Sequence, residues 1–425
     1  MKFLFLATSV IFAVLLAVGM SQRREHLASR AERDRLLERA RDMGLVSELE
    51  AGEPTKRRRH RGPVEGRLAL PELLALGREI PGGLDGADEH SRDKVFELFG
   101  RMTELSGDEL ESLIDDLQST PGLTDELRQQ YLGFSWVILA ELAPAAALQR
   151  LGEGGEEWLE DEEILQRVVA KALGEWAAQD PSSALQWARE AGVVLEDAAL
   201  KSLLTGMAQQ DPERALESVS ELGVVEPGEM LRAIAGAGKT PEARALILAA
   251  FRKKLAALAD APARDALRAM VLKGMADSLS GEGFGEISSW ISSQKLSPAE
   301  CEGFAAGLDY EVTGGDTGAW IAWVERAVPA ATRGERVGSL VSQWTQQDYL
   351  AAGQWLTQLP AGEARIPAVC AYAETVAEYD PQVAVQWALT LPAGAARVKT
   401  MQRIYQNWPK SDAAAAAQFA REQGF

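Results

Sequence analysis

Apolar residues recur every three to four positions along most of the chain, which is the pattern of helices that bury one face. After Leu68 such stretches follow one another with short breaks, for example over 92–103, 107–118, 124–140 and 162–178. The period-two alternation that marks a β-strand is nearly absent, so we expect no sheet. The pattern therefore predicts an all-α fold.

The N-terminus has a different pattern, because residues 3–20 form an uninterrupted apolar run behind a single lysine. A helix of this length spans about 27 Å, close to the thickness of a bilayer core. We predict that residues 1–21 are a transmembrane anchor. The alternative is a cleaved signal peptide, because Ala17-Val18-Gly19 loosely fits a cleavage site. We expect an extracytoplasmic (periplasmic) body anchored by its N-terminus, although the arginines after the run favour the opposite orientation.

The next segment is basic and polar. Residues 22–67 carry 13 Lys and Arg against 9 Asp and Glu, including a run of basic residues from Lys56 to Arg61. They predict a charged juxtamembrane helix and a flexible linker, whose basic run either touches anionic lipid headgroups or is simply solvated. We assign residues 68–142 to an N-terminal helical cap region and residues 143–425 to a helical repeat domain.

An aspartate-centred motif recurs in the repeat domain. It reads D-P-x-x-A-x-x-W, and adjacent clear copies follow one another with a period of about 31–32 residues, the size of one helical repeat unit. Its aspartates are Asp180, Asp211, Asp316, Asp348, Asp380 and Asp412. An aspartate before a proline favours a helix start, because the carboxylate caps free backbone N–H groups and proline suits the first turn. The alanine four positions later and the aromatic side chain seven later then lie on one helix face.

A second apolar or aromatic residue lies four positions before each of five of these aspartates, at the end of the preceding helix. It is Trp176, Met207, Trp344, Val376 or Trp408. Both helices of a unit thus contribute to one shared core, in which we expect the tryptophans to be buried. A unit of this size cannot bury its apolar face alone, so we expect an α-solenoid of about eight helix-turn-helix repeats.

This pattern resembles the tetratricopeptide-like class of helical repeats and, more closely, bacterial tandem helical-repeat proteins with a W…DP..A..W repeat. The resemblance covers about residues 143–425. It departs from the tetratricopeptide signature in lacking the Gly-Tyr pair and in having a period shorter than the roughly 34 residues of that class. The resemblance implies a groove that binds a protein or peptide, and it transfers no functional residue to this chain.

The residues that carry enzyme chemistry are scarce. The three histidines, His26, His60 and His90, precede the repeats, which removes histidine bases, triads and histidine metal ligands from the body. The two cysteines, Cys301 and Cys370, match no zinc spacing, and we expect two buried thiols, with a disulfide as the alternative. The sequence therefore predicts no catalytic residue, no metal and no cofactor.

The acidic charge of the body and the context of one glycine-containing motif argue against nucleic-acid and nucleotide ligands. Residues 68–425 carry 54 Asp and Glu against 30 Lys and Arg, so the body should repel nucleic-acid phosphates. The stretch from Ala233 to Thr240 superficially matches a phosphate-binding loop, but no strand precedes it, and we interpret Thr240 as the cap of the next helix. A carboxylate-dependent glycan hydrolase remains an alternative, and polar residues lining a cleft in the irregular stretch 223–315 would favour it.

One column of the repeat is a candidate binding site. Arg333, Arg365 and Arg397 each follow their aspartate at the same interval, at the start of the next helix. Arginines in register either grip carboxylates of a partner or pair with helix ends and aspartates inside the array. We take the column as the candidate partner-binding site of a membrane-tethered or exported interaction scaffold that is not an enzyme. A purely structural spacer is the third alternative.

Overall fold

A computed structural model of the chain confirms the all-α prediction for the residues that it describes, since every element in them is helical and none is a strand. The described residues are Leu74, Leu98, 100–121, 123–154, 159–190, 195–224, 227–279 and 282–424. The predicted membrane segment and the predicted linker, residues 3–20 and 22–67, lie outside them. Within the described part, no helix has the length and apolarity that a membrane span requires.

The chain divides into two compact units, Met1–Ala172 and Leu173–Phe425, and the division falls inside α7 (Glu162–Gln179). The predicted boundary between a cap region and a repeat domain, after residue 142, is not tested by this division and stays a prediction. In the first unit, α4 (Gly107–Ser119) packs on α5 (Asp125–Leu142), and α5 packs on α6 (Pro144–Gly152). The bounds of α4 and α5 agree with the stretches 107–118 and 124–140 predicted from the apolar pattern.

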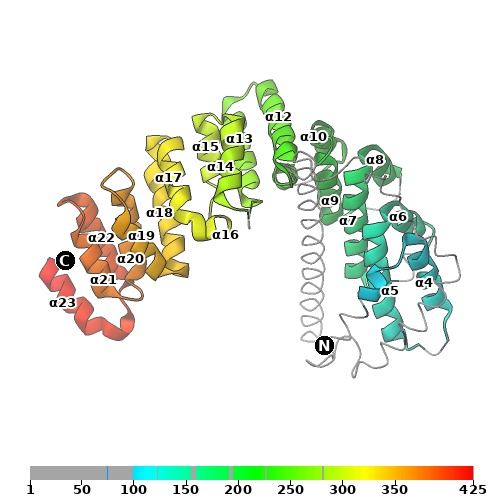
Figure 1. The fold of residues 1–425 in the computed structure, drawn as a ribbon, viewed down its shortest axis with the longest axis horizontal. Coiled ribbons are helices and arrows are strands. Elements are labelled where there is room, and N and C mark those ends of the chain that lie inside the picture. The colour runs from blue at the N-terminus through cyan, green and yellow to red at the C-terminus, as the bar shows by residue number, and fades with distance from the viewer. Residues whose placement is uncertain are drawn as a thin grey trace, which may run out of the picture. The chain divides into compact units, whose positions relative to one another are not determined.

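The second unit is a succession of helices joined by short turns (Figure 1). Its elements after α7 are α8 (Pro181–Glu190), α9 (Asp197–Ala208), α10 (Pro212–Glu221), α11 (Pro227–Ala235), α12 (Pro241–Ala257), α13 (Ala261–Asp277), α14 (Phe284–Gln294), α15 (Pro298–Ala305), α16 (Tyr310–Thr313), η3 (Gly314–Asp316), α17 (Thr317–Ala327), α18 (Ala330–Gln347), α19 (Tyr349–Gln358), α20 (Arg365–Val376), α21 (Pro381–Leu389), α22 (Ala395–Asn407), η4 (Lys410–Asp412) and α23 (Ala413–Gln423).

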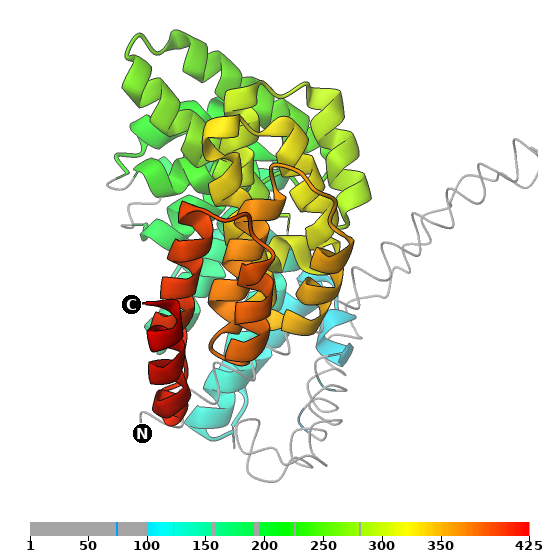
Figure 2. The same cartoon turned by 90° about the vertical axis from the view of Figure 1, so that its left-hand side faces the viewer.

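Alternate helices pack directly on one another. We call α9, α11, α13, α15, α18, α20 and α22 the second helices, because each follows a partner helix in its pair. They pack in two runs, α9–α11–α13–α15 and α18–α20–α22, and Figure 2 shows α20 and α22 side by side. Between the two runs the chain inserts α16, which packs on α17 and α18. The helix pattern is therefore interrupted once between α15 and α18.

Aspartate caps fix many of the helix starts. Four of the predicted caps are formed, with a carboxylate oxygen 2.9–3.1 Å from a backbone nitrogen of the helix: those of Asp180, Asp211, Asp348 and Asp380. Asp316 and Asp412 make no such bond to their own helices. The Asp316 carboxylate instead accepts from the backbone N–H of Phe284 at 3.0 Å, which ties the start of α14 to the start of α17.

Aromatic pairs confirm that the helices on either side of an aspartate share a core. The ring centroids of Trp344 and Trp355 lie 5.5 Å apart, and those of Trp408 and Phe419 lie 5.2 Å apart. These residues stand four before and seven after their aspartates, as the repeat predicts. The alanine between them is buried in the first pair, where Ala352 has no exposed surface, so the neighbouring helix approaches closely.

Candidate functional site

The predicted arginine column lies at the helix turns of the second unit. Each arginine stands near the start of a second helix and donates to a backbone carbonyl at or just beyond the end of the helix before it. Arg333 Nε donates to the Val328 carbonyl at 3.2 Å, and Arg397 Nε donates to the Leu391 carbonyl at 2.8 Å. Arg365 bonds the carbonyl of Leu359 in the same way.

These bonds have a clear physical reason. The last carbonyls of a helix have no partner within it, and an arginine in the next helix can satisfy them. The constant spacing from the aspartate places the guanidinium within reach of the preceding helix end in all three copies. Arg333 also pairs with Glu363 at 2.5 Å. The column thus has a structural role, and its binding of a partner stays a prediction.

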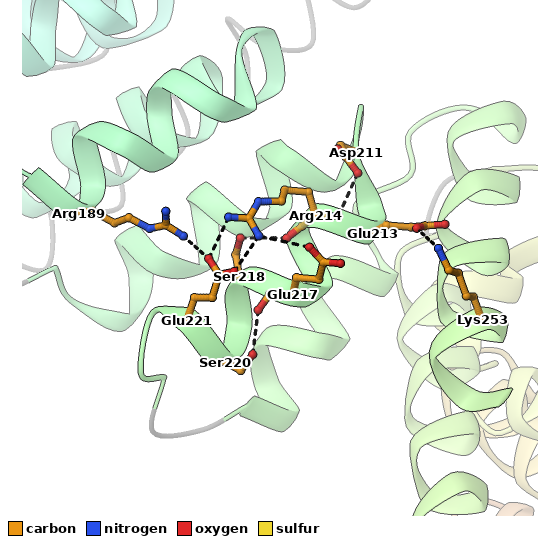
Figure 3. A network of polar contacts seen from close by, with 9 residues as sticks. All are labelled: Arg189, Asp211, Glu213, Arg214, Glu217, Ser218, Ser220, Glu221 and Lys253. Atoms are coloured by element: carbon orange, nitrogen blue, oxygen red, sulfur yellow. Dashed lines mark hydrogen bonds and ion pairs between the residues drawn. The ribbon is translucent and has the colours of Figure 1, made fainter. Parts of the chain in front are cut away.

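A row of ion pairs joins the helices that precede the second helices (Figure 3). Arg214 of α10 holds both carboxylate oxygens of Glu221 at 2.8 and 2.9 Å, and Arg189 of α8 pairs with the same carboxylate. The hydrogen bonds from Arg214 hold the pKa of Glu221 below its ordinary value. Lys253 of α12 pairs with Glu213 of α10. These pairs are exposed to solvent, where ion pairs contribute little to stability, and they satisfy one another's charge.

A cavity of about 310 Å³ opens at the interruption between the two runs of second helices. Its walls come from the end of α13, from the end of α15 with the residues that follow it, and from α18. The lining residues with polar or charged side chains are Lys273, Asp277, Asp309, Arg336, Ser339 and Gln343. None of the three arginines of the predicted column lines it.

The cationic lining residues of the cavity are Arg336 and Lys273. The Nε of Arg336 is buried and has no hydrogen-bond partner. Leaving a buried donor unsatisfied costs about 1–3 kcal/mol. Among the described residues, no ion pair engages the guanidinium of Arg336, whereas the ammonium of Lys273 attracts the carboxylate of Asp277, another lining residue.

The acidic lining residues are Asp277 and Asp309. Burial raises the pKa of Asp277 above its ordinary value, and the nearby Asp309 carboxylate raises it further, whereas Lys273 and Arg232 act in the opposite direction. Asp309 caps α16, since its Oδ1 accepts from the backbone N–H of Val312 at 2.9 Å. The cavity therefore holds carboxylates that already disfavour each other's charge.

Neutral polar groups hold the cavity wall in place. The backbone N–H of Tyr310 donates to Gln343 Oε1 at 3.0 Å, and Gln343 Nε2 donates to Ser339 Oγ at 3.2 Å. These bonds fix the residues after α15 against α18. Gly307 allows the close approach of α13, because a Cβ there would lie 2.8 Å from the Cβ of Ala276.

The remaining sequence candidates do not form a site. Thr240 Oγ1 accepts from the backbone N–H of Ala243 at 3.2 Å, which confirms that Thr240 caps α12. Cys301 and Cys370 are free thiols, and burial raises the pKa of each above its ordinary value. Across the described residues, no cluster of three or more His, Cys, Asp or Glu side chains is placed to hold a metal ion.

Comparison with known proteins gives no assignment, because no family model, curated protein or solved structure matches the chain. The candidate site must therefore be interpreted from its own chemistry. Sequence reasoning missed all six polar lining residues of the cavity. The signal that was present was the irregular stretch 223–315, where a polar cleft would interrupt the repeat, and three of the six lie within it.

Proposed function

We propose that the protein is an interaction scaffold, whose helix pairs form an α-solenoid of the tetratricopeptide-like kind and bind a segment of a partner protein. The partner lies along the second helices and is anchored at the polar cavity. The observation that carries the proposal is the cavity itself, which is lined by charged groups of both signs at the interruption of two runs of stacked helices.

Several further features support this choice over a purely structural spacer. A spacer gains nothing from a cavity that is lined by charges of both signs. A body with excess acid is suited to a partner segment of opposite or mixed charge. The arginine column remains a second candidate contact, since a guanidinium has five N–H donors and the helix-end carbonyls occupy only some of them.

We also propose that residues 3–20 tether the scaffold to a membrane and that its body faces the extracytoplasmic side. The apolar run at the N-terminus supports this proposal. Labelling of an engineered exposed cysteine, Lys399→Cys, with a membrane-impermeant maleimide in intact cells tests the orientation. A body on the outer side is labelled without permeabilisation, and labelling only after permeabilisation contradicts the proposal.

Site-specific photocrosslinking in native membranes tests the scaffold. A crosslinking amino acid replaces the exposed Ser339 at the cavity, and a control replaces the exposed Gln354 of α19. We expect one polypeptide to crosslink from position 339 and not from position 354, and the crosslink to weaken when Arg336→Gln is added. Equal adducts from both positions, or none from position 339, contradict the proposal.

The same crosslink tests the arginine column. The triple variant Arg333→Ala, Arg365→Ala and Arg397→Ala should reduce it if the column contacts the partner. Its melting temperature must be followed, because each change also removes a bond to a helix end. An undiminished crosslink in the folded triple variant leaves the column with its structural role alone.

A second candidate function is favoured by one observation. A cleft in the irregular stretch contains two aspartates, and the pKa of Asp277 is raised by burial, as a general acid requires. A glycan hydrolase needs only such a pair of carboxylates. If this alternative holds, Asp277→Asn and Asp309→Asn each abolish the release of reducing ends from envelope polysaccharides. If the wild-type protein releases none, the hydrolase alternative is wrong.

A further inference from the structure

An exposed pair of stacked tyrosines lies in the second unit, where α20 packs on both α19 and α21 (Figure 1). Tyr349 is the first residue of α19, and Tyr379 follows the end of α20. Their ring centroids lie 6.0 Å apart, and the ring planes differ by only 11°. Tyr349 is nevertheless 40% exposed and Tyr379 54%, and Leu350, next to Tyr349 in the chain, is 62% exposed. We call Tyr349 and Tyr379 the tyrosine platform.

Both tyrosines depart from the repeat. The residue after the aspartate is a proline in three other copies, and the residue before it is a glutamine in three copies: Pro181, Pro212, Pro381, Gln179, Gln210 and Gln347. The helix start does not require a tyrosine, since α10 and α21 begin in the same way with proline. Two adjacent copies thus carry aromatic rings at the two positions whose side chains meet, and exposed tyrosines are typical of binding surfaces.

A buried residue holds the platform in place. The hydroxyl of Tyr372 donates to the backbone carbonyl of Tyr349 at 3.1 Å, although Tyr372 is only 3% exposed. Gly353 makes room for this bond, because a Cβ there would lie 2.6 Å from the hydroxyl oxygen of Tyr372. The bond ties the start of α19 to α20, so the position of the first ring is fixed before a ligand arrives, and the ordering cost of binding is small.

The chain around the platform is acidic. Residues 337–396 carry five Asp and Glu residues against a single basic residue, Arg365. Arg365 begins α20 and bonds helix-end carbonyls there, a helix length away from Tyr379. Asp348 and Asp380 adjoin the two tyrosines in the chain, and each caps its helix through Oδ1, so the cap itself leaves Oδ2 for a further donor. Aromatic rings beside carboxylates attract a cation.

An arginine side chain fits both features. Its planar guanidinium stacks on an aromatic ring and keeps N–H donors for a carboxylate, whereas the ammonium of lysine is a compact, strongly hydrated charge. We propose that the tyrosine platform binds an arginine of a basic segment in a partner polypeptide, with the guanidinium stacked on the tyrosine pair and hydrogen-bonded to the adjoining aspartates. The inference goes beyond the proposed function, because Tyr349, Tyr379 and the two aspartates lie outside the lining of the polar cavity.

Isothermal titration calorimetry of three peptides with the purified full-length protein tests the inference. Each is an N-acetylated pentapeptide amide of glycines with two arginines, two lysines or two citrullines, and citrulline has the shape of arginine without its charge. Physiological salt screens the general attraction to the acidic body. We expect the arginine peptide to bind with a Kd below about 1 mM, and the other two at least about threefold more weakly. The inference is wrong if the arginine peptide does not bind, or if either other peptide comes closer to its affinity.

Variants that restore the repeat residues place the arginine peptide on the platform. Tyr349→Pro and Tyr379→Gln should each weaken its binding at least about threefold. The fold accommodates Tyr349→Pro, because Asp348 has nearly the same backbone angles (φ −150°, ψ 84°) as Asp380 before Pro381 (φ −143°, ψ 86°). Asp348→Asn keeps a capping side chain and removes the charge, so it should weaken binding likewise in a folded protein.

Two controls lie away from the platform. Leu389→Gln removes an exposed apolar side chain at the opposite end of α21, and Glu335→Gln removes an exposed carboxylate near the start of α18. Both should leave the affinity unchanged. Unchanged affinity in the platform variants, or equal losses in the controls, would overturn the inference. The photocrosslink at position 339 reports separately on the scaffold, so the two proposals can fail independently.

Discussion

Removal of Glu282 should leave a buried positive charge in α12. The side chain of Arg244 is only 4% exposed, and its Nη2 donates to both carboxylate oxygens of Glu282 at 2.6 and 2.7 Å. Its Nε donates to the carbonyl of Gly238 at 3.1 Å. Breaking a buried ion pair by removing one partner costs about 3–5 kcal/mol, because the remaining charge loses its compensation. Since the side chain of Glu282 is 30% exposed, we expect Glu282→Ala to cost about 3 kcal/mol.

Hydrogen–deuterium exchange of α12 measures this cost locally. Arrays of helix pairs open in parts, so the protection of the helix that carries Arg244 is a better measure than one global midpoint. A cost of about 3 kcal/mol corresponds to a loss of protection of roughly a hundredfold or more. Glu286→Ala, at an exposed position in the first turn of α14, is the control and should change protection little.

The double variant distinguishes an unpaired charge from a general loss of packing. Arg244→Met keeps an unbranched apolar side chain and removes the charge, so Arg244→Met with Glu282→Ala should be more stable than Glu282→Ala alone. A loss of protection below about threefold for Glu282→Ala would refute the reasoning. A double variant that is less stable than Glu282→Ala would refute it as well.

Two further predictions concern pH and packing. Burial raises the pKa of Glu300, but hydrogen bonds, above all from Arg252 at 2.7 Å, outweigh it and lower the pKa below its ordinary value. This pair should therefore stabilise the fold above the unfolded pKa of about 4.3, and its contribution should be lost as the pH falls through the lower folded value. Glu300→Gln should remove that part of the acid dependence of the melting temperature, and an unaltered dependence would contradict it. Gly307→Ala should destabilise by about 1–3 kcal/mol in chemical denaturation, because its Cβ meets Ala276. Gly315→Ala, with open space around its Cβ, is the control, and equal stability of the two variants would contradict the packing argument.

The helix bounds could be predicted from the sequence because their signals are local. A capping aspartate acts on backbone groups two or three positions away, so Asp211 and Asp348 reveal helix starts without reference to the rest of the fold. Asp316 shows the limit of this reasoning. Its carboxylate bonds the backbone N–H of Phe284, far earlier in the chain, and no local pattern announces that contact.

The candidate sites could not be located from the sequence alone, because they depend on how segments far apart in the chain pack together. The repeat spacing revealed the arginine column in the sequence. It left open whether the arginines face a partner or a helix end. The distance from Arg397 to the Leu391 carbonyl shows that this arginine bonds a helix end within the chain. The residues that line the cavity were harder still to predict from the sequence. Its wall combines Asp277 of α13 with Arg336 of α18, and that proximity depends on how α15 and α16 pack between them.

The charged cavity lies at the interruption of the helix pattern. Within the second run, polar groups of neighbouring second helices meet: Ser342 Oγ lies 2.9 Å from Thr375 Oγ1, and Asn407 Nδ2 donates to the Glu374 carbonyl at 2.8 Å. At the interruption, α16 packs on α17 and α18, and the buried Nε of Arg336 in α18 has no hydrogen-bond partner. The regular runs join polar groups of neighbouring second helices, whereas the interruption opens a cavity lined by charged groups, which is why we place the anchor of the partner at this cavity.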